Sequence, residues 1–339
     1  MKALRLLSIV FIIALFVSAL LWIEFFSPAE GDIDIVVSKG VPASFVAAKL
    51  EEKGIIGREE SFLAVARILH LDSKIKAGKY TFRKNLGNFR VLIALTRKGA
   101  GLQEVYVWIP EGSTIREIAL RLSSIGVDTA RFIKLTQDSA FIERLSRFFP
   151  RLNHPPTLEG YLFPDTYKFY WGASPEVIIY KMVRRLFNVL NDSMYKRMDE
   201  LHMNLHQILT LASIIEKEAQ VDFERPLISA VFHNRLRIRK PLESCATIQY
   251  ILPEHKFRLD YRDLKVKSPY NSYIYHGLPP TPIGSPSLAS IKAALWPAKV
   301  KYLYFVAKGD GTHFFARTYA EHRLNILKAR KLWKKLVLK

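Results

Sequence analysis

The chain has a single cysteine among its 339 residues, Cys245, so it cannot form an internal disulfide. It also lacks the HExxH and CxxC spacings of zinc sites, and it has no GxSxG, Walker or GxGxxG motif. His313, Glu321 and His322 lie near one another in the sequence. We expect His313 on a strand and His322 on a helix, which does not give the ligand spacing of a zinc site, so we interpret both histidines as structural. These absences leave proton transfer by carboxylates as the chemistry to look for.

Acidic residues are outnumbered: 31 Asp and Glu stand against 51 Lys and Arg, which gives a formal net charge of +20. Such an excess indicates an anionic partner, which could be nucleic acid, anionic lipid or an acidic cell-wall polymer. Hydrophobic residues make up 49% of the chain and charged residues 24%. The body of the chain is therefore globular, with enough length for two or three domains.

Charge is absent from residues 6–23, an apolar run just long enough to span a bilayer. Lys2 and Arg5 precede this run and acidic residues follow it, so the positive-inside rule places the N-terminus in the cytoplasm. A cleaved signal peptide is the alternative, but the small residues 17–19 lie inside the run rather than after it. We therefore expect residues 1–28 to form a single-pass anchor in the inner (cytoplasmic) membrane. With the remainder outside the cytoplasm, nucleic acid is not expected as a partner.

Strand and helix signals alternate in the segment that follows. We predict strands at 33–37 and 78–82 and helices at 44–53, 59–69 and 89–96. A weak repeat then appears at an offset of 72 residues (107 − 35), where Ile35–Gly40 recurs as Val107–Gly112. The repeat predicts a second strand–turn–helix module.

The remaining part of the chain is expected to be mainly helical, and the whole to be of the α+β class. Asn153-His154-Pro155-Pro156 indicates a domain boundary, and the loop at 268–286 is too rich in proline for regular structure. We predict helices at 132–149, 176–197, 205–221, 226–236, 287–296 and 321–339, and a hairpin from strands 302–307 and 313–315.

The sequence LASIIEKEAQ at 211–220 lies in a helix that is apolar on nearly every side. Glu216 and Glu218 near its end are ~200° apart around the axis and cannot share one task. Glu218 lies above Ile214 and Ile215, where desolvation would raise the pKa of its carboxyl and keep a proton available for donation. The alternative is that both acids belong to a solvated helix end.

Carboxylates and aromatic residues together are typical of enzymes that cleave glycosidic bonds, because acids transfer protons while rings stack on sugar faces. Most of these aromatic residues could equally be core residues. The candidate acids are Glu159, Asp165, Glu216, Glu218 and Glu243, and the aromatic residues are Tyr161, Phe163, Tyr167, Tyr170, Trp171, Tyr270, Tyr273 and Tyr275.

Six ordered motifs closely resemble the YceG-like (MltG) endolytic murein transglycosylases. They are LEGYLFPDTY (158–167), LTLASIIEKEA (209–219), VFHNRL (231–236), SPYNSYIYHGLPPTPIGSPS (268–287), SIKAALWPA (290–298) and YLYFVAKGDGTHFFARTYAEH (302–322). The resemblance implies cleavage of nascent peptidoglycan between N-acetylmuramic acid and N-acetylglucosamine, with a 1,6-anhydro-muramoyl product and no cofactor. The catalytic glutamate of the family falls on Glu218.

The resemblance also implies a domain order. After the anchor at 1–28 we expect a small LysM-like α/β module at 29–101, a second strand–helix module with connecting helices at 102–155, and a mixed α+β catalytic domain at 156–339 that ends in a basic helix. The expected partners are glycan strands, inner-membrane lipid and peptidoglycan synthases.

Several further residues are candidates for holding the sugar. Tyr270, Asn271 and Tyr273 are the main ones, together with Tyr161, Glu216 and Asn234. Asn234 and Arg235 could instead be structural and order either Glu216 or the helix pair.

This chain departs from the common family pattern in the cleft region. It has Leu242-Glu243-Ser244-Cys245-Ala246-Thr247 where many members read LQSDPT, and it has Thr281, Ser285 and Ser287 in the GLPP loop. These departures leave Glu218 untouched.

Two other functions stay open at this point. The first is a membrane-anchored, non-catalytic scaffold that binds peptidoglycan. The second is an ordinary hydrolase that uses Asp165 or Glu243 as a second carboxylate.

Overall fold

The computed structural model describes residues 32–97, 99, 101, 103–256 and 259–337. The chain divides into two compact units. One comprises the described residues up to Tyr106 with Ile125–Asp128 and Lys168–Ile178, and the other comprises Val107–Ser124, Thr129–Tyr167 and the chain from Ile179 onward. The expected anchor lies outside the described residues. Among the described helices, none combines the length and the apolar character needed to cross a bilayer.

The first unit begins with the order strand, helix, helix, strand, helix that the sequence predicts. The elements are β1 (Asp32–Val37), α2 (Ala43–Glu52), α3 (Glu59–Ile68), β2 (Gly78–Arg83) and α4 (Asn88–Thr96), with a short 3-10 helix at Asp72–Lys74. β1 and β2 pair antiparallel, with Asp32 opposite Arg83 and Val37 opposite Gly78. Their inward side chains pack with α2, α3 and α4 around Leu50, Phe62 and Leu92, which are fully buried.

The predicted second strand–turn–helix module is confirmed as local structure. β3 (Glu104–Trp108) is followed by α5 (Ile115–Ser123), and β3 forms a two-stranded sheet with β4 (Thr166–Tyr170). The turn glycines of the two copies adopt the same left-handed conformation, with φ of 76° at Gly40 and 73° at Gly112. Only glycine adopts this conformation at no steric cost, which explains why the repeat keeps it.

Two predictions of a single long helix are wrong. In each case the structure has two shorter helices, because a second helix begins within the predicted range. Residues 132–149 form α6 (Thr129–Leu135) and α7 (Ser139–Ser146), and residues 176–197 form α8 (Pro175–Val189) and most of α9 (Asp192–Glu200). Asp138 caps α7 by accepting from Phe141 N, and Asn191 caps α9 by accepting from Met194 N. Neither break carries glycine or proline, so the capping side chains were the only sequence signal.

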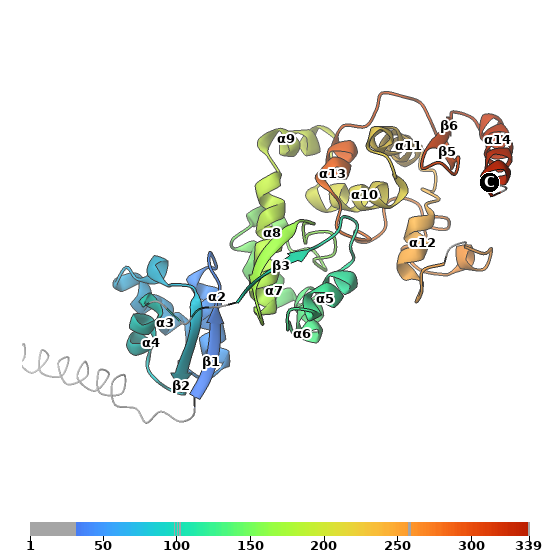
Figure 1. Cartoon of the computed structure of the whole chain (residues 1–339). Helices are drawn as coiled ribbons and strands as arrows, with labels where there is room; N and C mark the ends of the chain where they lie inside the picture. Colours follow the sequence, from blue (N-terminus) through green and yellow to red (C-terminus); the bar gives the residue numbers. More distant parts are fainter. Residues whose placement is uncertain (1–31, 98, 100, 102, 257–258, 338–339) are drawn as a thin grey trace, which may run out of the picture. The chain divides into compact units, whose positions relative to one another are not determined.

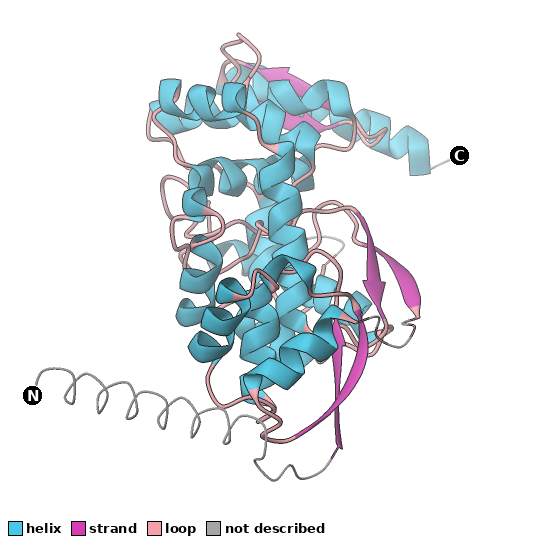
Figure 2. Cartoon of the chain, turned by 90° about the vertical axis from the view of Figure 1, so that its left-hand side faces the viewer, coloured by secondary structure: helices cyan, strands magenta, loops and turns pink. Residues whose placement is uncertain are grey.

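The core of the second unit is α10 (Leu205–Glu218), which packs against α11 (Arg225–Arg237), α12 (Cys245–Ile251) and α13 (Leu288–Leu295) (Figure 1). A short 3-10 helix, η3 (Asp222–Glu224), joins α10 to α11. The C-terminal region consists of the hairpin β5 (Tyr304–Ala307) and β6 (His313–Ala316) with α14 (Tyr319–Val337) against both strands. Figure 2 shows that helices predominate and that the strands form small pairs, so the predicted α+β class is confirmed.

A backbone clasp joins the turn at Gly112 to the loop at 284–287 within the second unit. Gly112 N donates to Ser285 O over 2.7 Å, and Ser285 N donates to Ser113 O over 2.8 Å. A Cβ on Gly284 would lie 2.4 Å from Gly112 O, so no side chain fits there. The clasp therefore brings the start of α5 to the proline-rich loop that precedes α13.

Candidate active site

Glu218 is the last residue of α10, and the sequence explains why the helix ends there. The helix starts at a capping box in which Asn204 and Gln207 each accept from the other's backbone N–H. Ile214 and Ile215, one turn before its end, are fully buried. Ala219 is already extended, and Glu218 itself is partly exposed. The buried core therefore fixes a helix whose final side chain still reaches solvent.

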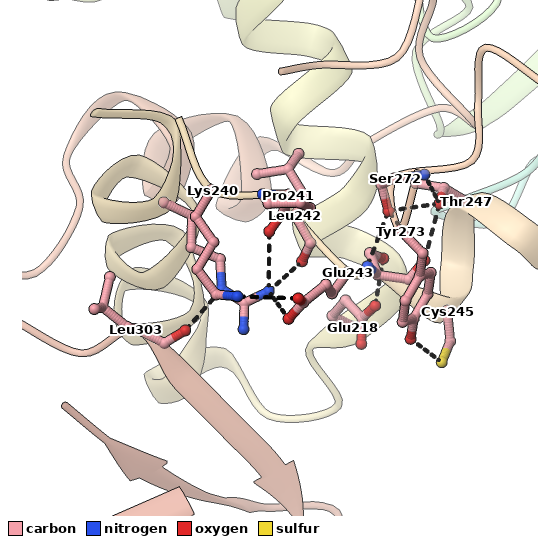
Figure 3. Close-up of polar contacts among 12 residues, drawn as sticks. Glu218, Lys240, Pro241, Leu242, Glu243, Cys245, Thr247, Ser272, Tyr273 and Leu303 are labelled. Atoms are coloured by element: carbon pink, nitrogen blue, oxygen red, sulfur yellow. Dashed lines mark hydrogen bonds and ion pairs between the residues drawn. The ribbon is translucent and has the colours of Figure 1, made fainter. Parts of the chain in front are cut away.

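One carboxyl oxygen of Glu218 is held by the start of α12. Ser244 Oγ donates to Glu218 Oε1 over 2.5 Å. Ser244 precedes α12 but makes no side-chain cap bond to it, because its hydroxyl is committed to Glu218. Ser272 Oγ accepts from Ser244 N and bonds Thr247 Oγ1, each over 2.9 Å (Figure 3).

Burial raises the pKa of Glu218 above its usual range, as the apolar stripe predicted. The hydrogen bond from Ser244, followed by nearby His313, the backbone of Ala246 and Arg235, partly opposes this rise. The C-terminal end of a helix adds to it, because the aligned carbonyls disfavour a negative charge there. The carboxyl of Glu218 therefore favours its protonated form, while the hydrogen bond from Ser244 can stabilise its ionised form.

Arg235 orders the loop that leads to Ser244. Its guanidinium donates to Leu303 O, Pro241 O and Leu242 O and to Glu243 Oε2, with the last at 2.8 Å. Glu243 has a left-handed φ of 51° and also pairs with Lys240 at 3.0 Å. Of the two structural roles considered for Arg235, the ordering of Glu216 is wrong, since Arg235 binds Glu243 instead. Figure 3 shows Glu218 between Glu243 on one side and Cys245 and Tyr273 on the other.

Tyr273 reaches this group from the proline-rich loop. Its hydroxyl lies 3.0 Å from Cys245 Sγ, and burial, followed by nearby Cys245 and Glu218, raises the pKa of Tyr273. Asn271 is fully buried: its Nδ2 donates to Leu264 O and Val266 O, and its Oδ1 accepts from Tyr273 N. Asn271 therefore has its polar atoms engaged within the loop and supports Tyr273.

Tyr270 bonds another residue of the same proline-rich loop. Its hydroxyl lies 2.7 Å from Thr281 Oγ1, and its ring lies 5.1 Å from that of Tyr250. Tyr250 also donates to Glu159, a buried carboxyl that accepts from Ile115 N at the start of α5. Burial raises the pKa of Glu159 to about 7. Glu159 thus links α5 to α12 rather than to Glu218.

Glu216 and Asn234 are both committed to internal contacts. Glu216 Oε1 pairs with Arg225 Nη1 at 3.1 Å, and Oε2 accepts from the backbone N–H and the hydroxyl of Ser287. Its side chain is 7% exposed. Asn234 Nδ2 donates to Val300 O and Tyr302 O, each over 2.9 Å. The structure thus gives Glu216 an arginine partner that the sequence did not suggest.

Tyr161 lies at the other end of α10. It is 1% exposed, its hydroxyl bonds His206 Nδ1 at 3.0 Å, and it lines a cavity of about 850 Å³ together with His206. Twelve residues (218 − 206) separate His206 from Glu218, which is ~18 Å along a helix. Of the sequence candidates, the structure therefore brings Tyr273 to Glu218 and leaves Tyr161 elsewhere.

The residues that sequence reasoning missed are the supports of Glu218. Ser244 was noted only as part of a variable hexapeptide, and no spacing relates it to α10. Glu224 and His313 form a buried pair at 2.7 Å, although the sequence suggested only a structural histidine. Within the described ranges there is no cluster of three or more His, Cys, Asp or Glu suited to hold a metal ion.

Comparisons with known proteins agree with the motifs. The sequence profile of the YceG-like family matches residues 35–328. A Bacillus subtilis protein named endolytic murein transglycosylase is 32% identical over 313 residues, which are 87% of this chain and 85% of that protein. Two Streptococcus pneumoniae proteins of the same name are 29% identical over 328 residues. This chain spans 59% of their length.

A solved structure extends the agreement from sequence to fold. The crystal structure of a YceG-like protein from Listeria monocytogenes superposes with a TM-score of 0.59 and 32% identity. The match covers 86% of this chain and 98% of that one. The profile covers well over half of the chain, and the relatives cover nearly all of it. The chain therefore belongs to the YceG-like family.

Proposed function

We propose that this protein is an endolytic lytic transglycosylase that cleaves nascent peptidoglycan strands between N-acetylmuramic acid and N-acetylglucosamine. The observation that carries the proposal is Glu218, a carboxyl with a raised pKa whose one oxygen is held by Ser244. Relatives that bear the name endolytic murein transglycosylase support the reaction class. A general acid needs a pKa close to the operating pH, which is the direction of the shift at Glu218.

The proposed cycle uses Glu218 twice. The protonated carboxyl gives its proton to the glycosidic oxygen as the bond to muramoyl C1 breaks. The resulting carboxylate then removes the proton of the C6 hydroxyl of the same sugar, and that oxygen closes on C1 as the 1,6-anhydro ring. The proton is thereby returned to Glu218 and no water is consumed. The Ser244 hydroxyl supports the carboxylate between the two steps.

A two-carboxylate hydrolase receives less support. The two acids considered as a second carboxylate are both in ion pairs: Glu243 with Arg235 and Lys240, and Asp165 with Arg185 at 2.6 Å. In each of these acids a cation engages at least one carboxylate oxygen, so neither carboxylate is free to position an attacking water. We therefore favour the lyase outcome, in which exclusion of water decides the product.

Tyr273 is the proposed contact for the sugar next to Glu218. Its position is supported by Asn271, while Tyr270 braces the same loop against Thr281. Glu216 and Asn234 are proposed to order the helices behind the site. Because Tyr161 is far from Glu218, it is proposed to contact only a more distant part of a long glycan.

The expected setting of the enzyme is also part of the proposal. Residues 1–28 would anchor it in the inner membrane with the catalytic part outside the cytoplasm, next to newly made glycan and its synthases. The order β1–α2–α3–β2 supports the reading of residues 29–101 as a LysM-like, glycan-binding module. Anionic lipid or wall polymer would match the net charge of +20.

The test is incubation of the purified full-length protein with lipid-linked glycan or sacculi, followed by mass spectrometry of the muropeptides. We expect anhydro-muramoyl ends from the wild type and none above background from Glu218→Gln. Reducing ends from the wild type would establish a hydrolase. Binding to sacculi without any cleavage would establish the non-catalytic scaffold instead.

A further inference from the structure

The helix α14 has an inner face that packs on the β5–β6 hairpin (Figure 1). Asn325 Nδ2 donates to Phe315 O over 3.2 Å, and Trp333 Nε1 donates to Ala307 O over 3.4 Å. Ala329, halfway between these two side chains, is buried. Residues 325, 329 and 333 are four apart, so they form one stripe along the helix. This stripe fixes which side of α14 faces the hairpin and which side faces away from it.

The side of α14 that faces away exposes two large apolar residues. Leu324 is 58% exposed and Leu327 is 54% exposed. They are three residues apart and therefore neighbours on the helix surface, roughly opposite the stripe that packs on the hairpin. Exposed apolar side chains that lie together, with polar residues around them, are typical of a surface that meets a partner or a membrane.

Basic side chains surround the two leucines. Those that lie on the same side of the helix and are exposed are Arg323, Lys328, Lys331 and Lys334. The sequence of α14 contains one acidic residue, Glu321, and its carboxylate accepts from the backbone N–H groups of Arg317 and Thr318 at the start of the helix. The outer face of α14, defined by these four cations with Leu324 and Leu327, is therefore uniformly positive.

Leucines among cations match an anionic lipid surface. A helix of this kind lies in the plane of the interface, with its apolar side chains at the acyl boundary and its Lys and Arg side chains at the headgroups. A soluble anionic polymer would engage the cations but leave the leucines in water. A second copy of the chain would present the same positive face and be repelled.

We propose that the outer face of α14 is a second membrane contact, which docks on anionic lipid headgroups and inserts Leu324 and Leu327 at the acyl boundary. This inference rests on the proposed setting, in which residues 1–28 anchor the chain and the catalytic part lies outside the cytoplasm. Because the anchor already holds the chain at the membrane, even a weak contact is occupied at the resulting effective concentration. α14 and Glu218 belong to the same compact unit, so the contact keeps that unit at the membrane surface.

The experiment is hydrogen exchange of the α14 amides in the full-length protein, reconstituted in nanodiscs. One set of discs contains only phosphatidylcholine, and the other also contains phosphatidylglycerol. At low salt we expect exchange in α14 to be roughly 10-fold slower in the anionic discs, because each basic residue near such a surface contributes up to about 5-fold in binding. The difference should disappear at about 1 M salt, where the screening length is ~3 Å.

Two sets of substitutions separate charge from insertion. The triple variant Lys328→Gln, Lys331→Gln and Lys334→Gln should lose most of the slowing. Leu324→Gln with Leu327→Gln should also lose it, although every cation is kept. If either protein fails to fold, the salt dependence of the wild type still tests the contact.

The matched control removes three exposed lysines elsewhere in the same unit, by Lys292→Gln, Lys299→Gln and Lys301→Gln. It should exchange like the wild type in both discs. Incorporation into both discs with equal exchange in α14, or an equal loss of slowing in the control, would overturn the contact and leave the anchor standing. Slowing that appears only on addition of teichoic acid, or that survives in the double leucine variant, would overturn the lipid assignment in favour of a soluble polymer.

The measurement is independent of catalysis, because hydrogen exchange requires no cleavage of glycan. Glu218→Gln should therefore show the same slowing as the wild type, whatever its activity. A protein that does not enter the phosphatidylcholine discs would overturn the proposed anchor and, with it, this inference.

Discussion

The last turn of α10 carries two glutamates, Glu216 and Glu218, whose partners differ in kind. Glu216 faces Arg225, so its charge is balanced by a buried cation at 3.1 Å. Glu218 instead accepts a hydrogen bond from a neutral donor, the Ser244 hydroxyl, over 2.5 Å. The same side chain is thus fixed as a structural anion at one position and left able to exchange a proton at the other. The comparison teaches that the partner, not the residue type, decides the role.

The strongest test of this comparison is Glu218→Gln. The amide keeps the shape but can neither donate a proton nor take it back. We expect glycan cleavage to fall by roughly 10⁴-fold, the upper end for general acid–base catalysis, since one group provides both steps. The free energy of unfolding should change by about 1 kcal/mol or less, because only the hydrogen bonds to the start of α12 are altered. Release of anhydro-muropeptides and thermal melting measure the two effects.

Glu216→Gln should show the opposite pattern. Removing Glu216 leaves Arg225 with Asp222, whose side chain is 85% exposed, as its remaining carboxylate partner. We expect a loss of about 3 kcal/mol in the free energy of unfolding, the lower end for breaking a buried ion pair. Activity per folded molecule should stay within roughly 10-fold of the wild type. Denaturant unfolding and active-protein titration separate the two quantities. A Glu216→Gln protein as inactive as Glu218→Gln, yet fully stable, would break the comparison.

Glu200→Gln provides the control for Glu216→Gln. Glu200 pairs with Arg197 at 2.7 Å, but its side chain is 48% exposed. Exposed pairs contribute little, so we expect a change below ~1 kcal/mol.

Ser244→Ala sharpens the comparison by removing a neutral donor from Glu218. The Ser244 hydrogen bond lowers the pKa of Glu218, so its loss raises that pKa further. The protonated acid then persists to higher pH, and the alkaline limb of the kcat profile should move upward. We expect kcat near pH 7 to fall about 10-fold, since a hydrogen bond to a charged group contributes ~1.5 kcal/mol or more. Ser123→Ala, at an exposed serine at the end of α5, is the control.

Tyr273→Phe should have the smallest effect. It removes the hydroxyl next to Cys245 Sγ but keeps the ring. We expect KM to rise by roughly 3-fold, with kcat and the melting temperature nearly unchanged, because a single neutral hydrogen bond is lost. Steady-state kinetics on a defined glycan measures both constants. A fall in kcat of the size seen for Glu218→Gln would mean that Tyr273 also moves the proton.

The sequence was informative where local periodicity and caps decide the structure. The strands and helices of the first unit and the buried helix that ends at Glu218 follow from apolar spacing and glycine turns. The divided helices at 132–149 and 176–197 were missed because Asp138 and Asn191 act through side-chain caps, which are weaker signals than glycine or proline.

The site was predictable only in its central residue. Glu218 could be singled out because its neighbours one turn earlier are in the same helix. Its support by Ser244 could not, because Ser244 reaches it from a segment 26 residues (244 − 218) further along. The partner of Glu216 was likewise missed: the sequence analysis considered Arg235, whereas packing brings Arg225 of the same helix to Glu216.

The clasp between Gly112 and Ser285 has a consequence for how the molecule is made. The two residues are 173 apart (285 − 112), so during synthesis the turn at Gly112 emerges long before the segment that completes it. Long-range closures of this kind slow folding, because loop entropy is lost before the contact is gained. The carboxyl of Glu218 depends on the start of α12 in the same way, through Ser244. We therefore expect the clasp and the Glu218–Ser244 contact to form late, after most of the chain has emerged.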